Sequence, residues 1–242
     1  MFAFQDTDDG VGVAFTDRRG GVSAAPFDSL NLGIGTDDDP ASVARNYDLV
    51  GSAIGVAPGR IARMHQVHGA EVLVVRDPPG TSRPPQVDGM VTDRPGLALS
   101  VRVADCVPVL LADAGASVVG CAHAGRSGLA AGVVPRTVQA MRDLGARRVR
   151  AWVGPHVCGG CYEVPERMRD EVSAVVPQAR STTTWGTPAL DIGAGVEAQL
   201  RAEGVELVET PTRCTREDPE LYSHRRDGGR AGRSAGLVWL RG

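Results

Sequence analysis

The chain has 242 residues, of which 42% are hydrophobic and 23% are charged, and its formal net charge is −3. These values are ordinary for a globular protein, and a chain without a basic field is not expected to bind nucleic acid or an anionic membrane. All 26 basic residues are arginines, which excludes a lysine Schiff-base mechanism and favours bidentate recognition of carboxylate or phosphate.

Short apolar runs rich in β-branched residues predict strands. In chain order these runs are residues 11–15, 71–75, 96–111, 117–122, 148–153, 205–208 and 236–240. Longer stretches with helical spacing of their apolar residues predict helices. These stretches are residues 40–54, 129–144, 165–176 and 191–203.

Several local signals sharpen these boundaries. Asp39 followed by Pro40 is a typical helix start, while Pro135 should kink the helix over 129–144 or mark its true beginning. The segment 76–86 carries four prolines and is expected to be an exposed loop. Because strands and helices alternate without a regular rhythm or an internal repeat, we expect one α+β domain over residues 1–242. Its sheets should be mixed, with helices packed outside.

The five cysteines are an odd set in a chain that is too long to need disulfides for stability. The first residues show neither the basic segment nor the long apolar segment of a secretory signal. No apolar stretch approaches the roughly 20 residues that span a membrane. We therefore expect a cytoplasmic protein whose reduced thiols serve a metal, catalysis or packing.

Three dispersed residues stand at the ends of apolar runs, namely His68, Cys106 and His123. Two imidazoles and one thiolate are the ligand set of an open catalytic zinc site, in which water or substrate takes the fourth position. The same residues could instead be a cysteine nucleophile with histidine bases. The residue types alone leave both readings open.

Neighbouring residues compete for a place in this site. His65 lies three positions before His68, and if this stretch enters the strand over 71–75 the two side chains point to opposite faces, so only one should reach the site. Gly69 permits a close approach and favours His68. Cys121 lies two positions before His123 and shares its face in a strand, so it is an alternative ligand.

Two segments carry features of an anion site. The turn after His123 leads into a helix whose first N–H groups, together with Arg126, would suit a phosphate or carboxylate. A basic segment near the end contains His224 and Arg225 and predicts either a solvated loop or an arginine-lined pocket.

Cys158 and Cys161 have the two-residue gap of a zinc knuckle or a redox pair. The chain has no second pair of this kind, and the nearest histidine, His156, lies in the same loop. The sequence alone therefore does not predict a structural zinc there.

Longer phrases follow one another in a recognisable order. They are TDRRGGVSAAPFDSLNLGIGTDD, QVHG, VDGMVTD, ADCVPVLL, AHAGRSGLAAGVV, GPHVCGGCYEV and the final RRDGGRAGR. In these phrases the chain resembles, nearly end to end, the YfiH family, long labelled a multicopper polyphenol oxidase or laccase-type domain and later a purine nucleoside phosphorylase family.

The resemblance implies a layered α/β/β/α fold, also likened to cysteine-hydrolase-like toxin domains. It implies zinc bound by His68, Cys106 and His123. It further implies phosphorolysis of adenosine, inosine, guanosine and methylthioadenosine, together with adenosine deamination, so nucleoside and phosphate are the expected partners. Arg19 and Asn31 fall in the N-terminal phrase and are expected to line the substrate pocket.

The chain departs from the family pattern at several positions. Arg126 and Ser127 stand where the family usually has Trp and Arg, Gly160 replaces a second cysteine before Cys161, and His224 takes the position of a tyrosine. None of these positions belongs to the histidine and cysteine trio. The departures therefore bear on substrate preference, with Arg126 expected to replace the missing arginine.

Two other functions compete with a zinc nucleoside enzyme. A metal-free cysteine hydrolase or amidase would use Cys106 as nucleophile and suits the editing of peptidoglycan precursors, a role linked to some members of the family. A copper polyphenol oxidase needs a blue-copper site plus a histidine-rich cluster for oxygen chemistry. With five histidines and no His-x-His pair, the chain fits that function least.

Overall fold

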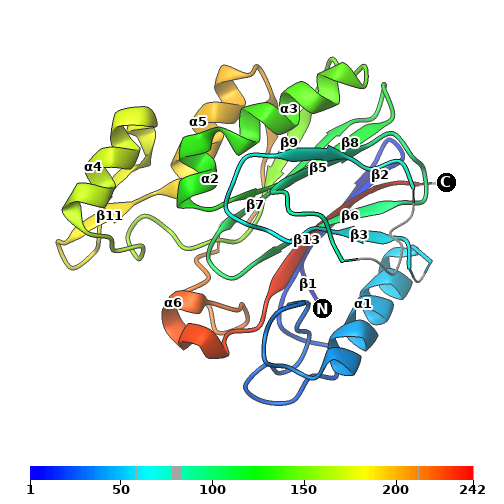
Figure 1. Ribbon diagram of the computed structural model, residues 1–242, viewed down its shortest axis with the longest axis horizontal. Coiled ribbons are helices and arrows are strands. Elements are labelled where there is room, and N and C mark those ends of the chain that lie inside the picture. Colours follow the sequence, from blue (N-terminus) through cyan, green and yellow to red (C-terminus); the bar gives the residue numbers. More distant parts are fainter. Residues whose placement is uncertain (58, 78–82, 212, 242) are drawn as a thin grey trace.

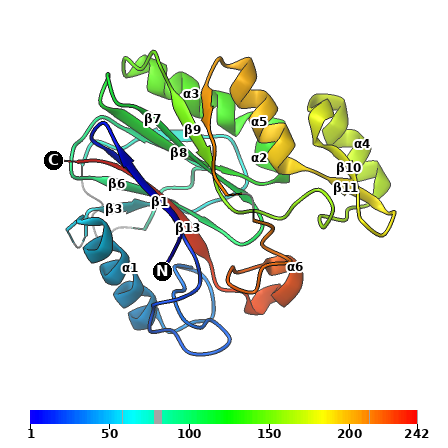
Figure 2. The same cartoon turned by 180° about the vertical axis from the view of Figure 1, so that it is seen from behind.

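Two mixed β-sheets lie face to face at the centre of the protein (Figures 1 and 2). The computed structural model describes residues 1–57, 59–77, 83–211 and 213–241. The five-stranded sheet has, in spatial order, β1 (Phe2–Asp8), β2 (Val11–Thr16), β13 (Ser234–Leu240), β6 (Ala98–Val103) and β3 (Ile61–Arg63). The six-stranded sheet has β12 (Glu206–Val208), β9 (Arg150–Val153), β7 (Val107–Asp113), β8 (Val118–Ala124), β5 (Gly89–Thr92) and β4 (Val72–Val74).

Both sheets combine parallel and antiparallel pairs. The pairs β3–β6, β4–β5 and β9–β12 are parallel, and the other pairs within the two sheets are antiparallel. A separate antiparallel hairpin is formed by β10 (Arg180–Thr182) and β11 (Pro188–Leu190).

Helices cover the two outer faces of the sheets. They are α1 (Pro40–Ile54), α2 (Arg126–Ala131), α3 (Val133–Asp143), α4 (Glu166–Val175), α5 (Ile192–Ala202) and α6 (His224–Asp227), with short 3-10 turns at Pro177–Ala179 and Gly228–Arg230. No helix among the described residues is both long and apolar enough to cross a membrane.

Three apolar cores separate four layers. The first packs α1 against the five-stranded sheet, the second fills the space between the sheets, and the third packs α2, α3 and α5 on the six-stranded sheet. Because each strand buries one face in the central core and the other under helices, most strands are apolar along their whole length. The expected α+β class and the α/β/β/α layering are confirmed.

One predicted strand is in fact two strands, and the break between them forms part of the site. The run over 96–111 divides into β6 and β7, which belong to different sheets. The chain crosses between the sheets at Ala104, Asp105 and Cys106, and Asp105 adopts a left-handed φ of 89°. The crossing therefore presents Cys106 at the junction of the two sheets.

Other boundaries differ for local reasons. The helix predicted over 129–144 is interrupted at Gly132, whose φ is 79°, so Pro135 lies in the first turn of α3 and does not kink a longer helix. Only Val72–Val74 of the run over 71–75 is a strand, and residues 64–71 form a loop. Part of the proline-rich loop predicted over 76–86, residues 78–82, lies outside the described residues.

Candidate active site

A cavity of about 470 Å³ opens where the chain crosses between the sheets. It is lined by Gly33, Ile34, Gly35, Thr36, His65, Gln66, His68, Arg102, Val103, Ala104, Asp105, Cys106, His123, Tyr162, His224, Arg225 and Arg233. The lining comes from segments far apart in the sequence, with a histidine and cysteine group at its base and arginines around it.

The structure brings His68, Cys106 and His123 together. One donor atom from each lies within 4.8 Å of the other two, and Cys106 Sγ is 3.8 Å from His68 Nε2. Ligands of a tetrahedral zinc at the usual bond lengths lie roughly 3.3–3.8 Å apart, so a small closure of the trio would complete the shell. His123 is buried while His68 is exposed, which leaves one side of the group open to the cavity.

Each member reaches the site by a different route. His123 lies on β8, Cys106 in the crossing between β6 and β7, and His68 in a loop where its φ is 59°. Gly125 allows them to meet, because a Cβ at this position would lie 2.7 Å from His68 Cδ2 and 3.1 Å from Cys106 Sγ. The glycine that the site requires is therefore Gly125, while a Cβ at Gly69 would find only ordinary contacts.

Asp88 holds two of the three residues in place. Its fully buried carboxylate accepts hydrogen bonds from His123 Nδ1 at 2.8 Å and from the backbone N–H groups of His68 at 3.0 Å and Gly69 at 2.7 Å. With the proton on Nδ1, Nε2 of His123 is left unprotonated and able to bind a metal, the arrangement by which carboxylates orient metal-binding histidines. Sequence inspection missed Asp88, although VDGM is one of the quoted phrases.

The electrostatics suit a metal that displaces a proton. Burial would raise the pKa of Asp88, but the hydrogen bonds from His123 and the neighbouring N–H groups outweigh it and lower that pKa. Burial lowers the pKa of His123, which keeps the ring neutral and able to bind a cation. Burial, helped by Asp105, raises the pKa of Cys106 to about 12, so without a cation this group is a thiol.

Three arginines give the cavity its positive charge. Among the described residues, no carboxylate oxygen lies within 4.0 Å of the guanidinium nitrogens of Arg102, Arg225 or Arg233, whereas nearby Arg213 and Arg226 are paired with Asp218 and Asp227. Burial lowers the pKa of Arg102 and of Arg233. Nε of Arg102 is buried and has no hydrogen-bond partner among the residues that the structure describes. An anion in the cavity would satisfy these groups.

Comparison with known proteins identifies the relatives of this chain. A family model described as multi-copper polyphenol oxidoreductase laccase matches residues 12–241. The chain belongs to this family. A Streptomyces coelicolor protein named purine nucleoside phosphorylase is 54% identical and covers 99% of this chain and 100% of its own length. A Mycobacterium tuberculosis protein of the same name is 50% identical, covering 93% of this chain and 90% of the relative.

Solved structures of the family have the same fold. Neisseria meningitidis protein NMB0706 superposes with a TM-score of 0.85 at 32% identity, covering 99% of both chains. Geobacillus stearothermophilus YlmD has a TM-score of 0.87 at 31% identity, covering 96% of this chain and 93% of that one. Bacillus licheniformis YfiH has a TM-score of 0.86 at 29% identity with the same coverage. The expected resemblance to the YfiH family is thus confirmed.

Of the four residues expected to bind substrate or phosphate, only one lines the cavity. Arg225 lines the cavity and lies over the ring of Tyr162 at 4.5 Å. The cavity lining includes neither Arg19, which pairs with Glu220 at 2.6 Å, nor Arg126 in the six-residue helix α2. Fully buried Asn31 lies behind the lining, where its side-chain oxygen accepts hydrogen bonds from the N–H groups of Gly33 and Arg233.

Two expectations about competing ligands can be compared with the geometry. The expected strand at His65 and His68 is wrong, because this stretch is a loop and both residues line the cavity. Only His68 belongs to the close trio. Cys121 is fully buried in the core between the sheets, two positions deeper along β8 than His123.

Proposed function

We propose that the protein is a zinc-dependent purine nucleoside phosphorylase in which His68, Cys106 and His123 hold the metal. The main support for the proposal is that this trio and three arginines line the same cavity. Among the residues described, none of these arginines has a carboxylate partner. The substrate class is supported by the names of relatives at 54% and 50% identity. Adenosine, inosine, guanosine and methylthioadenosine are the proposed substrates.

In this proposal Arg102, Arg225 and Arg233 bind and orient phosphate, so that one of its oxygens attacks C1′ of the ribose. The C1′–oxygen bond forms as the bond from C1′ to the purine nitrogen breaks, and the leaving nitrogen takes up a proton from solvent. The products are the free base and the sugar 1-phosphate, which is ribose 1-phosphate for the ribonucleosides and 5-methylthioribose 1-phosphate for methylthioadenosine. Zinc, when bound, supplies electrophilic activation of water or of a substrate atom. Asp88 keeps the unprotonated nitrogen of His123 directed at the metal.

The contact of Cys106 Sγ with His68 Nε2 at 3.8 Å also has the composition of a cysteine nucleophile and its base. Nucleophilic cysteines, however, occur where neighbours lower the thiol pKa. Here burial and Asp105 raise the pKa of Cys106 to about 12, which favours a ligand that loses its proton only to a metal. We therefore rank a cysteine hydrolase acting on peptidoglycan precursors second.

The metal is proposed to be zinc even though the family description names copper. A multi-copper oxidase needs further histidine-bound copper beside a blue-copper site. Of the five histidines, two are in the trio, His65 and His224 line the cavity outside it, and His156 lies elsewhere. A His₂Cys group with an open fourth position instead matches a catalytic zinc site. We also propose that residues 1–242 act as one domain in the cytoplasm, where the thiols stay reduced.

The deciding experiment incubates the zinc-loaded protein with each nucleoside, with and without phosphate, and identifies the products. Phosphorolysis predicts the sugar 1-phosphate and the free base only when phosphate is present. Conversion of adenosine to inosine without phosphate would show the deamination that the open ligand position and the family resemblance also suggest. Activity that survives chelation but is lost on thiol alkylation would favour the cysteine hydrolase, and stoichiometric copper with oxygen consumption would favour the oxidase.

The arginine assignment has its own test in steady-state kinetics. Arg233→Gln and Arg102→Gln should each raise KM for phosphate by about tenfold or more, since a hydrogen bond to a charged group contributes ~1.5–3 kcal/mol, with a smaller change in KM for the nucleoside. Arg201→Gln is the matched control, because this exposed arginine pairs with Glu197 on α5. An unchanged KM for phosphate in both cavity variants would contradict the assignment.

A further inference from the structure

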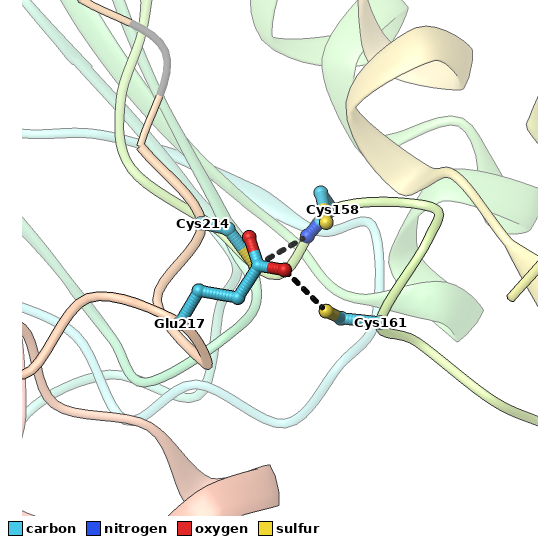
Figure 3. A group of neighbouring side chains, drawn as sticks. All are labelled: Cys158, Cys161, Cys214 and Glu217. Carbon is cyan, nitrogen blue, oxygen red and sulfur yellow. Dashed lines mark hydrogen bonds between the residues drawn. The ribbon is translucent and has the colours of Figure 1, made fainter. Parts of the chain in front are cut away.

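A second group of potential metal ligands lies outside the cavity trio (Figure 3). It consists of Cys158, Cys161, Cys214 and Glu217, and one donor atom from each lies within 4.8 Å of all the others. The geometry points to a second, structural zinc site held by these three thiolates and one carboxylate. This group is called the cysteine cluster below, and its occupancy does not depend on the reaction proposed for the cavity.

The cluster is built from two similar turns. The carbonyl of Cys158 accepts the N–H groups of Cys161 at 2.9 Å and Tyr162 at 3.1 Å. The carbonyl of Cys214 accepts those of Glu217 at 3.2 Å and Asp218 at 3.0 Å in the same way. Each turn therefore presents two ligands with a two-residue gap, as in the paired knuckles of structural zinc sites, with Glu217 in the place of a fourth cysteine.

The two turns are joined to each other by direct contacts. Residues His156 and Cys214 form a parallel bridge, the N–H of Cys158 donates to Cys214 Sγ at 3.4 Å, and Cys161 Sγ lies 3.4 Å from Glu217 Oε1 (Figure 3). Three soft sulfur donors and one carboxylate favour zinc over calcium or magnesium, which prefer oxygen ligands. His156 is not part of the group, since its ring lies against Gly193 of α5.

The surroundings can carry the negative charge of a zinc bound by four anionic ligands. Arg216 lies between Cys214 and Glu217 in sequence, and its Nη1 donates to the carbonyl of Cys161 at 3.3 Å. Arg226 Nη1 donates to the carbonyls of Thr215 at 2.8 Å and Asp218 at 3.1 Å, which fixes the second turn. Arg216 offsets part of the charge, while Arg226, whose own charge is paired with Asp227, holds the second turn in place.

The cluster also supports one wall of the active-site cavity. Val157, next to Cys158, donates its N–H to the carbonyl of Asp105 at 3.0 Å, and Thr215, next to Cys214, donates its hydroxyl to the Asp105 carboxylate at 2.6 Å. Tyr162, next to Cys161, lines the cavity. A metal in the cluster would therefore hold the strained turn that presents Cys106.

Metal analysis of the full chain, purified under reducing conditions with Zn²⁺ as the only added metal, tests the proposal. The wild-type protein is expected to bind two zinc ions, Cys106→Ala one, Cys214→Ser one, and the double variant none. Cys121→Ala is the matched control and should keep two, because this buried cysteine belongs to neither group. With Co²⁺ in place of zinc, most of the sulfur-to-metal charge-transfer absorption should survive in Cys106→Ala and disappear in Cys214→Ser.

A second variant tests the cluster even if Cys214→Ser fails to fold. Glu217→Gln changes an exposed side chain and should keep the circular dichroism spectrum while lowering zinc affinity of the cluster by about tenfold or more. No bound zinc in the folded wild type, or an unchanged zinc content in Cys214→Ser, would overturn the proposal. So would a disulfide within the cluster in the zinc-loaded protein, detected as a mass loss of two hydrogens. A single zinc that is lost in Cys214→Ser and kept in Cys106→Ala would still place the metal in the cluster.

Discussion

The cavity trio and the cysteine cluster are both linked to the turn at Asp105, and they differ in how many ligands they offer. The trio contributes three donors from three distant segments and opens onto a cavity. The cluster contributes four donors from two short turns. Zinc sites with three protein ligands keep a position for water or substrate, and sites with four are closed. If both groups bind zinc as proposed, the number and origin of the ligands, rather than cysteine itself, separate the reactive centre from the structural one.

The largest effect should come from removing one ligand from each group and comparing activity. Loss of even an outer partner of a metal ligand costs roughly 10–100-fold, so Cys106→Ala should lower kcat/KM for phosphorolysis by more than about a hundredfold. Cys214→Ser should lower it by less than about tenfold, because it acts only through the turn at Asp105. Steady-state assays of both variants check this. Equal losses of kcat/KM in the two variants would contradict the proposal that one group is catalytic and the other structural.

The next effect concerns the residue that orients His123. Asp88→Asn removes the charge that the ring hydrogen-bonds to, and outer partners of this kind typically contribute about 10–100-fold to metal affinity. Competition with a chelator, in a Cys214→Ser background so that only the trio is loaded, measures it. Asp113→Asn is the control, since this buried carboxylate accepts backbone N–H groups from Arg147 and Arg148 and lies outside the cavity lining. A similar loss in both variants would show a general effect of lost folding stability.

A third effect is the pH dependence of zinc binding at the trio. The pKa of Cys106 is raised to about 12, so the thiol proton must leave when metal binds, whereas the lowered pKa of His123 leaves that ring already neutral. One released proton makes affinity rise about tenfold per unit between about pH 7.5 and 9. The same competition assay across this range measures the slope. In Cys106→Ala the slope should vanish, and a pH-independent affinity in the Cys106-containing protein would contradict the assignment.

The smallest effect should appear when the link between the two groups is cut. Thr215→Val keeps the side-chain shape but removes the 2.6 Å hydrogen bond to Asp105, which is worth roughly 1.5–3 kcal/mol when the acceptor is charged. Urea unfolding should show that loss, with kcat/KM falling only severalfold. Thr137→Val is the control, because its hydroxyl bonds a carbonyl within α3. If Thr215→Val lowers stability no more than the control does, the Asp105 link does not matter.

Sequence patterns predicted most of the helices and strands whose formation depends on local residues. Helix α1 begins at Pro40 after the Asp39 cap, as expected, and the strands that form both sheet centres overlap the predicted apolar runs. Short strands such as β3 and β5 were missed because three or four residues carry little pattern. The run over 96–111 predicts one strand because both of its halves are apolar, and apolar character alone does not reveal a crossing between sheets.

By itself, the sequence determined which residue types were present to make a reactive centre, and the family phrases identified His68, Cys106 and His123 among the alternatives. Only the tertiary structure showed what surrounds these three residues: the buried Asp88, the close approach at Gly125, and the arginines Arg102 and Arg233 in the cavity lining. The tertiary structure also places Cys214 and Glu217 beside Cys158 and Cys161, for which the sequence offered no further ligands. The physical reason is that these residues meet across sheets and turns, and the spacing of residues along a chain does not encode contacts made by packing layers.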